Sequence, residues 1–271
     1  MRIALGVSYN GQTYNGWQSQ TDGNTVQDKL EAALGRFATH RISTLCAGRT
    51  DSGVHGLMQV VHFDTELQRP ESSWVRGTNA FLPSDIAVQW ARVVPDSFHS
   101  RACATSRRYA YVLLQSPVRP SVETGRVGWV FNALNGDAMR QAASCLIGEH
   151  DFSSFRASAC QALTPVKTLY RLDITRRAVA PSLHRDMECC YWRFEFEGSA
   201  FLHHMVRNIM GCLIAIGDSS HPPQWMEHVL AMRSRDAAAP TFSPNGLYFM
   251  GPVYDPQWGL PDRVPGFDWL P

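Results

Sequence analysis

The segment AGRTDSGVHG, at positions 47–56, places a single carboxylate, Asp51, among small residues. Arg49 stands two positions before it, and glycines at 48, 53 and 56 would allow positive φ angles and the close approach of a ligand. A carboxylate presented on such a loop can act as a nucleophile or a general base. Aspartate is also common at turns and helix N-caps. The arginine and the glycines together favour the chemical role for Asp51.

Two further residues, His55 and Trp17, have two interpretations each. His55 closes the same segment, where its imidazole could transfer protons or could simply hydrogen-bond to backbone. Trp17, followed by Gln18, lies in a polar, glycine-rich stretch over residues 11–23. It could contact a nucleic acid or anchor the loop. The sequence alone leaves both questions open.

Arg207 interrupts a largely apolar segment, Phe201–Ile216, that predicts a helix. On that helix His203 and Arg207 would share a face at i and i+4. Burying an unpaired guanidinium is costly, so Arg207 is expected to have an anionic partner, and Asp51 is the best candidate. Such a pair would keep the carboxylate ionised and lower its pKa. A structural ion pair elsewhere, or a solvent-facing arginine, is the alternative. His203 and His204 are adjacent, a poor spacing for two ligands of one metal, and are interpreted as structural.

Tyr109 lies in SRRYAY, residues 106–111, where strand alternation puts Tyr109 and Tyr111 on one face and Arg108 on the other. The surrounding stretch, residues 101–126, holds five arginines and one acidic residue, a local net charge of +4. Arginine forms planar, bidentate contacts with phosphate and stacks on bases. A tyrosine beside it can also stack on a base. A core tyrosine, and an arginine bias of the genome, are the alternatives.

The composition restricts the class of protein. The chain has 271 residues, 44% of them hydrophobic, and a net charge of only +1, which argues weakly against binding that relies on bulk charge. No apolar stretch approaches the about 20 residues of a membrane span, and the start of the chain does not have the pattern of a secretory segment. Seven cysteines without a C-x-x-C pair predict a reduced, cytoplasmic protein with no structural zinc.

The hydrophobic pattern predicts an α+β fold. Strands are expected over 2–9, 44–47, 59–63 and 86–94, with helices over 26–37, after a capping box at Thr25-x-x-Asp28, and over 73–80. This β-α-β-β-α-β order is typical of a split β-α-β, ferredoxin-like half. The pattern then restarts, with strands at 107–114, 169–177, 187–197 and 247–253 and helices at 137–146, 201–216 and 223–232. An irregular tail is expected from Asp255.

Several motifs together resemble the family of tRNA pseudouridine synthase I, the TruA family. They are YNG at 9–11 with GWQ at 16–18, AGRTDSGVH at 47–55, RRY at 107–109, DFSSF at 151–155, HHMVRN at 203–208 and GLY at 246–248. They occur in the family's order over nearly the whole chain. The order of the elements predicts two ferredoxin-like halves packed around a central catalytic cleft, with a mostly antiparallel sheet. Residues 1–100 would carry the Asp51 loop, and residues 101–271 would complete the RNA-binding cleft.

The resemblance also implies a role for individual residues. Asp51 would be the catalytic aspartate, Tyr109 would stack on the target uracil, and Arg207 would be the basic partner of the aspartate. Leu247 would form the apolar wall of the pocket, and Arg49 would help to flip the base and fill its place. The implied activity is isomerisation of uridine to pseudouridine at positions 38, 39 and 40 of the tRNA anticodon stem-loop. A homodimer holding tRNA across both subunits is implied, without metal or cofactor.

Two departures from the family pattern and two competing functions remain. Ser52 stands where alanine is common, and the segment APTFSP at 239–244 differs from the usual stretch, which could alter a tRNA contact or a loop length. A catalytically idle RNA-binding protein on the same scaffold is one alternative. A hydrolase acting on nucleosides or glycosides is the other, but glycosidases generally use two nearby carboxylates, and the Asp51 segment has one.

Overall fold

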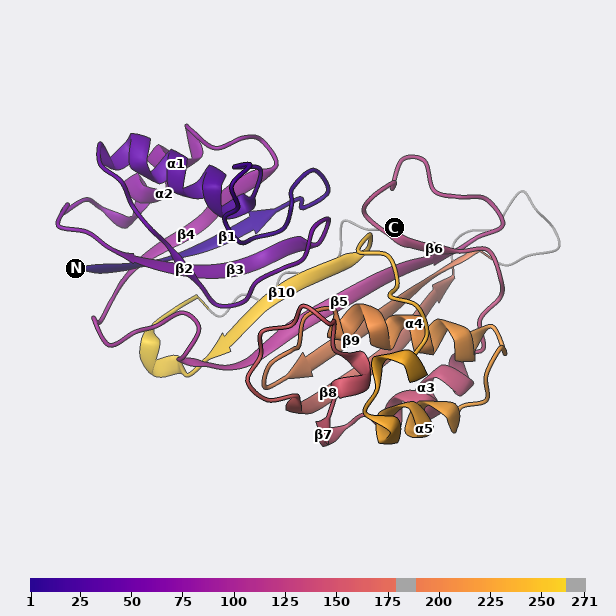
Figure 1. The fold of residues 1–271 in the computed structure, drawn as a ribbon. Helices are drawn as coiled ribbons and strands as arrows, with labels where there is room; N and C mark the ends of the chain where they lie inside the picture. The colour runs from indigo at the N-terminus through magenta and orange to yellow at the C-terminus, as the bar shows by residue number, and fades with distance from the viewer. Residues whose placement is uncertain (179–188, 262–271) are drawn as a thin grey trace. The chain divides into compact units, whose positions relative to one another are not determined.

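The computed structural model describes residues 1–178 and 189–261. The chain divides into two compact units. The first unit contains residues 1–107 and the described chain from Tyr248 onward, and the second contains the described residues of 108–247. Figure 1 shows the elements of both units. The two units are described separately below.

The first unit is built on a mostly antiparallel sheet with two helices on one face (Figure 1). Its strands are β1 (Arg2–Tyr9), β2 (Leu45–Cys46), β3 (His55–Asp64), β4 (Ile86–Val94) and β10 (Leu247–Tyr254). The neighbours run β4-β1-β3-β10, and β2 pairs with β3 farther along the strand. β1 is antiparallel to β3 and β4, whereas β10 is parallel to β3.

The helices of the first unit are α1 (Val26–Ala38) and α2 (Glu71–Asn79). α1 begins where the capping box predicts, because the Thr25 side chain accepts a hydrogen bond from the Asp28 amide. Apolar side chains of both helices pack on the sheet, and Phe37 of α1 meets Trp74 of α2 edge to face at 5.2 Å. The apolar spacing of each helix is therefore explained by the core it covers.

A smaller core lies around Phe98, which follows β4 and is fully buried. Phe98 packs with Ala47, Val60, Tyr254 at the end of β10 and Trp258 in the chain after it, and both of these aromatic rings have centroids 5.3 Å from that of Phe98. Trp258 belongs to a short 3-10 helix, Pro256–Trp258. The irregular tail expected from Asp255 thus contains one helical turn, and its part beyond residue 261 lies outside the described residues.

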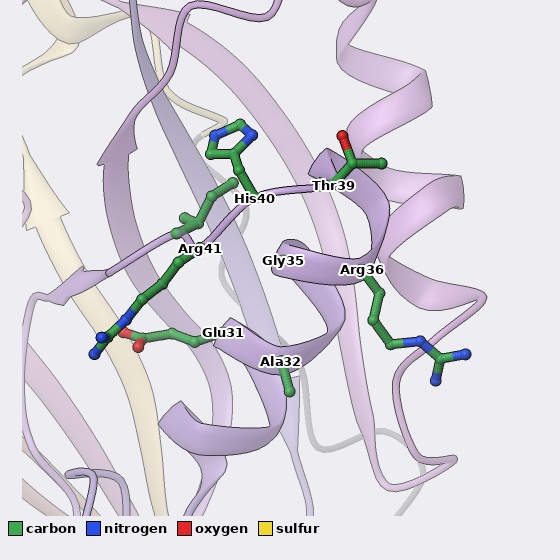
Figure 2. Close-up of a pocket in the computed structure, with 8 residues that line it drawn as sticks. Glu31, Ala32, Gly35, Arg36, Thr39, His40 and Arg41 are labelled. Atoms are coloured by element: carbon green, nitrogen blue, oxygen red, sulfur yellow. The ribbon is translucent and has the colours of Figure 1, made fainter.

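A hollow of about 550 Å³ lies at the C-terminal end of α1. Figure 2 shows the residues that line it. Its lining comes from α1 and the chain just after it: Glu31, Ala32, Gly35, Arg36, Thr39, His40, Arg41 and Ile42. The Glu31 carboxylate accepts hydrogen bonds from the amide and hydroxyl of Thr44, at 2.7 and 2.9 Å. Glu31 therefore ties α1 to the segment leading into β2.

The second unit is also a mostly antiparallel sheet with helices on one side (Figure 1). Its strands are β5 (Ala104–Gln115, which starts in the first unit), β6 (Gly128–Val130), β7 (Gly148–Asp151), β8 (Val166–Ala178) and β9 (Cys190–Gly198). The order is β5-β9-β8-β7, with β6 parallel to β5. Its helices are α3 (Gly136–Ser144), α4 (Met205–Gly217) and α5 (Trp225–Met232), with 3-10 turns at Ser153–Phe155 and Arg235–Ala237.

The structure confirms the predicted fold class, a mixed α+β protein with a mostly antiparallel sheet. Most predicted elements are present, but the helix expected over Phe201–Ile216 begins only at Met205. The short strands β6 and β7 were not predicted, because runs of 3 and 4 residues carry too little alternation. Met187, placed in a strand by the sequence, lies outside the described residues. No helix in residues 1–178 and 189–261 has the length and apolarity to span a membrane.

Candidate active site

Asp51 lies in the connection between β2 and β3, in the first unit. Its side chain is half-buried, and Arg49, two residues before it, is exposed. A tight turn follows, in which the Val54 amide donates to the Asp51 carbonyl at 3.1 Å. Gly53 has a φ of 79° in this turn, a conformation that favours glycine. Of the three glycines of the segment that could adopt a positive φ, only Gly53 does so.

The Asp51 connection is anchored by the loop that precedes α1. The amide of Trp17 donates to the Thr50 carbonyl at 3.0 Å, and the Ser52 hydroxyl donates to the Tyr14 carbonyl at 3.1 Å. Gly16, with a φ of 89°, allows this approach, since a Cβ there would lie 2.7 Å from the Thr50 oxygen. The Trp17 side chain is fully buried. Trp17 is therefore an anchor of the loop, and the alternative of a nucleic-acid contact by its ring is wrong.

His55 is the first residue of β3 and is buried, with 2% of its surface exposed. Its Nδ1 accepts a hydrogen bond from the Gly11 amide at 3.2 Å. Its ring stacks on Tyr248 of β10, with centroids 4.7 Å apart. A neutral His55 then carries its proton on Nε2. These contacts favour the backbone-bonding interpretation of His55.

Tyr109 lies in β5, in the second unit, and is half-buried. Its ring meets Phe201 edge to face at 5.0 Å. Tyr111, two residues on, is fully buried, and its hydroxyl donates to the Ser243 carbonyl at 3.0 Å. The sequence treats the two tyrosines alike, whereas the structure makes Tyr111 a core residue and leaves Tyr109 with part of its surface accessible.

Arg207 is the third residue of α4, and its side chain is half-buried. Its Nε donates to the Phe242 carbonyl at 2.9 Å, and the Phe242 amide donates to the Arg207 carbonyl at 3.2 Å. His203 precedes the helix, so the predicted i, i+4 face shared by His203 and Arg207 is wrong. The cause is His204, the N-cap residue of α4, which has a φ of 63° in the left-handed region. A residue in this conformation does not continue a right-handed helix, so the helix begins after it.

The divergent segment 239–244 lies along α4 as a strap. Besides Phe242, the Thr241 hydroxyl donates to Asn208 Oδ1 at 2.7 Å, and the Ala239 amide donates to Cys212 Sγ at 3.4 Å. Gly211 makes room for the strap, because a Cβ there would lie 2.2 Å from the Pro240 oxygen. The segment therefore holds Arg207 through the backbone of Phe242, and a segment with different side chains could make the same contacts.

Leu247 is buried, with 4% of its surface exposed, and begins β10. Its amide donates to the Pro244 carbonyl at 3.0 Å, which places it directly after the strap. Gly246 before it has a φ of 88° and lies against backbone atoms of Val112 and Gly128, at which a Cβ would clash. The residue at position 247 is thus held from both sides by local geometry.

The candidate residues are distributed over both units. Asp51 and Arg49 belong to the first unit, and Tyr109, Arg207 and Leu247 to the second. The pairing of Asp51 with Arg207 stays a prediction. Within the first unit, the sequence reasoning missed the buried hydroxyl of Tyr9, which bonds to Thr50 next to Asp51. Tyr9 was recognised only as part of a motif, and its motif position is the one signal that could have indicated it.

Comparison with known proteins identifies the family of the chain. The family model described as tRNA pseudouridine synthase matches residues 6–101 and 142–255. The matched ranges include Arg49, Asp51, Arg207 and Leu247, while Tyr109 falls between them. Three similar curated proteins, each named tRNA pseudouridine synthase A, align over the full length of both chains. They are 75% identical in Delftia acidovorans, 73% in Paracidovorax citrulli and 69% in Polaromonas naphthalenivorans. At this identity and coverage, the chain belongs to the tRNA pseudouridine synthase family.

Proposed function

We propose that this protein isomerises uridine to pseudouridine at positions 38, 39 and 40 of the tRNA anticodon stem-loop, with Asp51 as the essential group. Family membership supports the reaction and the tRNA substrate. The observation that carries the proposal is the Asp51 connection. It offers one half-buried carboxylate beside an exposed arginine on a loop whose backbone is hydrogen-bonded on both sides.

The chemistry needs only a well-placed carboxylate and a closed site. The N1–C1′ bond of uridine breaks, the uracil turns, a C5–C1′ bond forms, the C5 proton leaves to water, and N1 gains a proton from water. No redox change or net hydrolysis takes place. An ionised Asp51 can start this reaction by attacking the ribose at C1′, by attacking the uracil, or by removing a ribose proton to give a glycal. A site closed to water protects the detached uracil.

The other candidates have roles that follow from their chemistry. Tyr109 stacks on the target uracil and Leu247 forms the apolar wall beside it. Arg207 pairs with Asp51 and keeps it ionised. Arg49 is exposed and has no ion pair within residues 1–178 and 189–261, so its guanidinium is available to fill the space left by the flipped base. Base flipping costs a few kcal/mol, least where pairing is already weak, as at a stem-loop junction.

The test is release of tritium from tRNA labelled at uracil C5, with the wild type beside Asp51→Ala. We expect release by the wild type only, with tRNA binding and melting temperature retained in the variant. Asp96→Ala, which removes an exposed carboxylate of the same unit, is the matched control and should keep full release. Transcripts with uridine at only one of positions 38, 39 and 40 then test each position separately.

Each other outcome contradicts the proposal in a distinct way. Binding without release from any tRNA would identify an RNA-binding protein without this activity. Free uracil as the product would identify a hydrolase. Normal release by Asp51→Ala would retain the isomerase but remove Asp51 from the chemistry.

The tRNA is proposed to be held across two subunits of a homodimer. Light scattering with and without tRNA tests this, and a particle with the mass of one chain bound to one tRNA would contradict it.

A further inference from the structure

Tyr9, the last residue of β1, has a buried side chain that reaches the Asp51 connection. Its hydroxyl lies 2.8 Å from Oγ1 of Thr50, the residue directly before Asp51. Only 4% of Tyr9 and 7% of Thr50 are exposed, so the two hydroxyls meet away from water. A buried polar group without a partner is costly, and this bond therefore constrains both side chains.

Gly56 explains how the Tyr9 ring takes this path. Tyr9 pairs with Gly56 across β1 and β3, next to an irregularity in the register. A Cβ at position 56 would lie 2.4 Å from a ring carbon of Tyr9 and 2.9 Å from its hydroxyl oxygen. The ring therefore lies over a glycine that has ordinary backbone angles. Gly56 is required by this close approach and not by a turn.

Gln59 holds the other side of the same connection. Its side chain is fully buried, its Oε1 accepts from the Gly48 amide at 3.4 Å, and its Nε2 donates to the Gly48 carbonyl at 2.5 Å. The backbone at 48 and the side chain at 50 are thus both fixed from the interior. On either side of the buried Thr50, Arg49 is exposed and Asp51 is half-buried.

Burial also keeps the Tyr9 hydroxyl in one chemical state. Desolvation raises the pKa of Tyr9 far above its usual value, and hydrogen bonding by Thr50 and Gln59 only partly opposes this. The hydroxyl therefore stays protonated at every pH at which the protein would work. Tyr9 cannot exchange protons with a substrate there, and its hydroxyl is available only as a hydrogen-bonding group.

We infer that Tyr9, Thr50 and Gln59 form a clamp that positions the Asp51 carboxylate, with Tyr9 acting through Thr50. The inference rests on the proposed function for its catalytic consequence. None of the three side chains needs to touch the substrate. A displacement of a reacting group by about 1 Å can cost about a hundredfold in rate, so the loss of one of the buried bonds that hold this loop can slow the reaction.

The test uses variants that remove one hydroxyl each. Tyr9→Phe and Thr50→Val should each lower kcat about tenfold, and KM for tRNA should stay within about twofold. The double variant should be no slower than either single variant, because each substitution breaks the same bond. Thr50→Ser, which keeps the hydroxyl, should restore most of kcat.

Tyr254→Phe is the matched control. It removes a tyrosine hydroxyl of the same unit that donates to the Ser100 carbonyl at 2.5 Å and makes no hydrogen bond to residues 47–54. Its kcat should equal that of the wild type. An unchanged kcat in Tyr9→Phe would overturn the inference. So would an equal loss of kcat in Tyr254→Phe, since the effect would then be general destabilisation.

Amide hydrogen exchange separates the clamp from the proposed function. Tyr9→Phe should speed exchange at the Gly48, Gly53 and Val54 amides about tenfold, while Tyr254→Phe leaves them unchanged. This measurement needs no tRNA and no turnover. A wild type that fails to isomerise uridine would refute the proposed function alone, and unchanged exchange in Tyr9→Phe would refute the clamp.

Discussion

Arg207 connects two parts of the second unit through one side chain. Its Nε bond to the Phe242 carbonyl joins α4 to the strap at 239–244. Arg207→Ala should therefore lower stability by about 1.5–3 kcal/mol, the range for a hydrogen bond from a charged group, and should also lower turnover because it leaves Asp51 without its proposed partner. Thermal melts and tritium release measure the two effects.

Arg207→Lys separates charge from geometry at the same position. It keeps a positive charge but lacks the Nε donor, so we expect partial recovery of turnover with little recovery of the melting temperature. If Arg207→Ala melts like the parent and turns over normally, both the strap contact and the pairing with Asp51 are unimportant.

The end of α1 provides a prediction for a single element. Its C-cap, Thr39, lines the hollow of Figure 2 and has a φ of 62°, where a β-branched side chain is strained. Glycine has no such penalty. Thr39→Gly should therefore stabilise the protein by about 0.5–1 kcal/mol, a figure that includes the loss of the hydrogen bond from the Thr39 hydroxyl to the Ala38 carbonyl. Thr39→Ala loses the same bond but keeps the Cβ. A glycine variant that unfolds no later in urea than the alanine variant would contradict this explanation.

Strand β3 contains a histidine whose titration should destabilise the first unit in acid. His62 is buried, with its Nδ1 3.2 Å from the Ser100 amide that donates to it. Burial, with the nearby positive charges of His99 and Arg2, lowers the pKa of His62 to about 4. The unfolded chain, with an ordinary pKa near 6.5, therefore binds the extra proton between about pH 6.5 and pH 4.

The contribution of neutral His62 to the free energy of unfolding should consequently be complete above about pH 6.5. It should fall as the pH drops toward 4, by on the order of 3 kcal/mol at most. Urea unfolding at pH 7 and pH 4.5 measures this. His62→Asn places an amide oxygen near the Nδ1 position and does not titrate, so its stability should change less over this range. An equally steep change in the variant would assign the acid sensitivity to other groups.

The success of the sequence analysis differed from element to element for identifiable reasons. α1 was predicted within one residue because a capping box and an apolar stripe coincide. α4 was predicted to begin four residues too early, because Phe201 and Leu202 continue its apolar pattern while the backbone at His204 departs from the helix. The Tyr9–Thr50 bond joins residues 41 apart, and no local pattern could have indicated it. The motif residues themselves were identified, but their anchoring depends on tertiary contacts.

At the scale of the whole molecule, charge must act locally, because the net charge is only +1. Within the arginine-rich stretch, Arg107 is engaged by the carbonyls of Ala104 and Arg101. Arg108 is different: its buried Nε has no hydrogen-bond partner in the described part of the chain. A guanidinium N–H that has no protein acceptor can donate to a phosphate oxygen. Arg107 therefore has a structural role, whereas Arg108 keeps one N–H without an acceptor within the described residues.

Affinity for tRNA should fall as salt rises, with a linear dependence of log K on log salt concentration. Arg101 and Arg119 are exposed and form no ion pair with any residue in 1–178 or 189–261. If they contact phosphates, Arg101→Gln and Arg119→Gln should each reduce the magnitude of the slope by about 1. Arg140→Gln, whose arginine is already paired with Asp137 at 2.8 Å, should leave it unchanged. Filter binding at several salt concentrations measures the slopes, and a flat response of the wild type would contradict an ionic contact with the tRNA backbone.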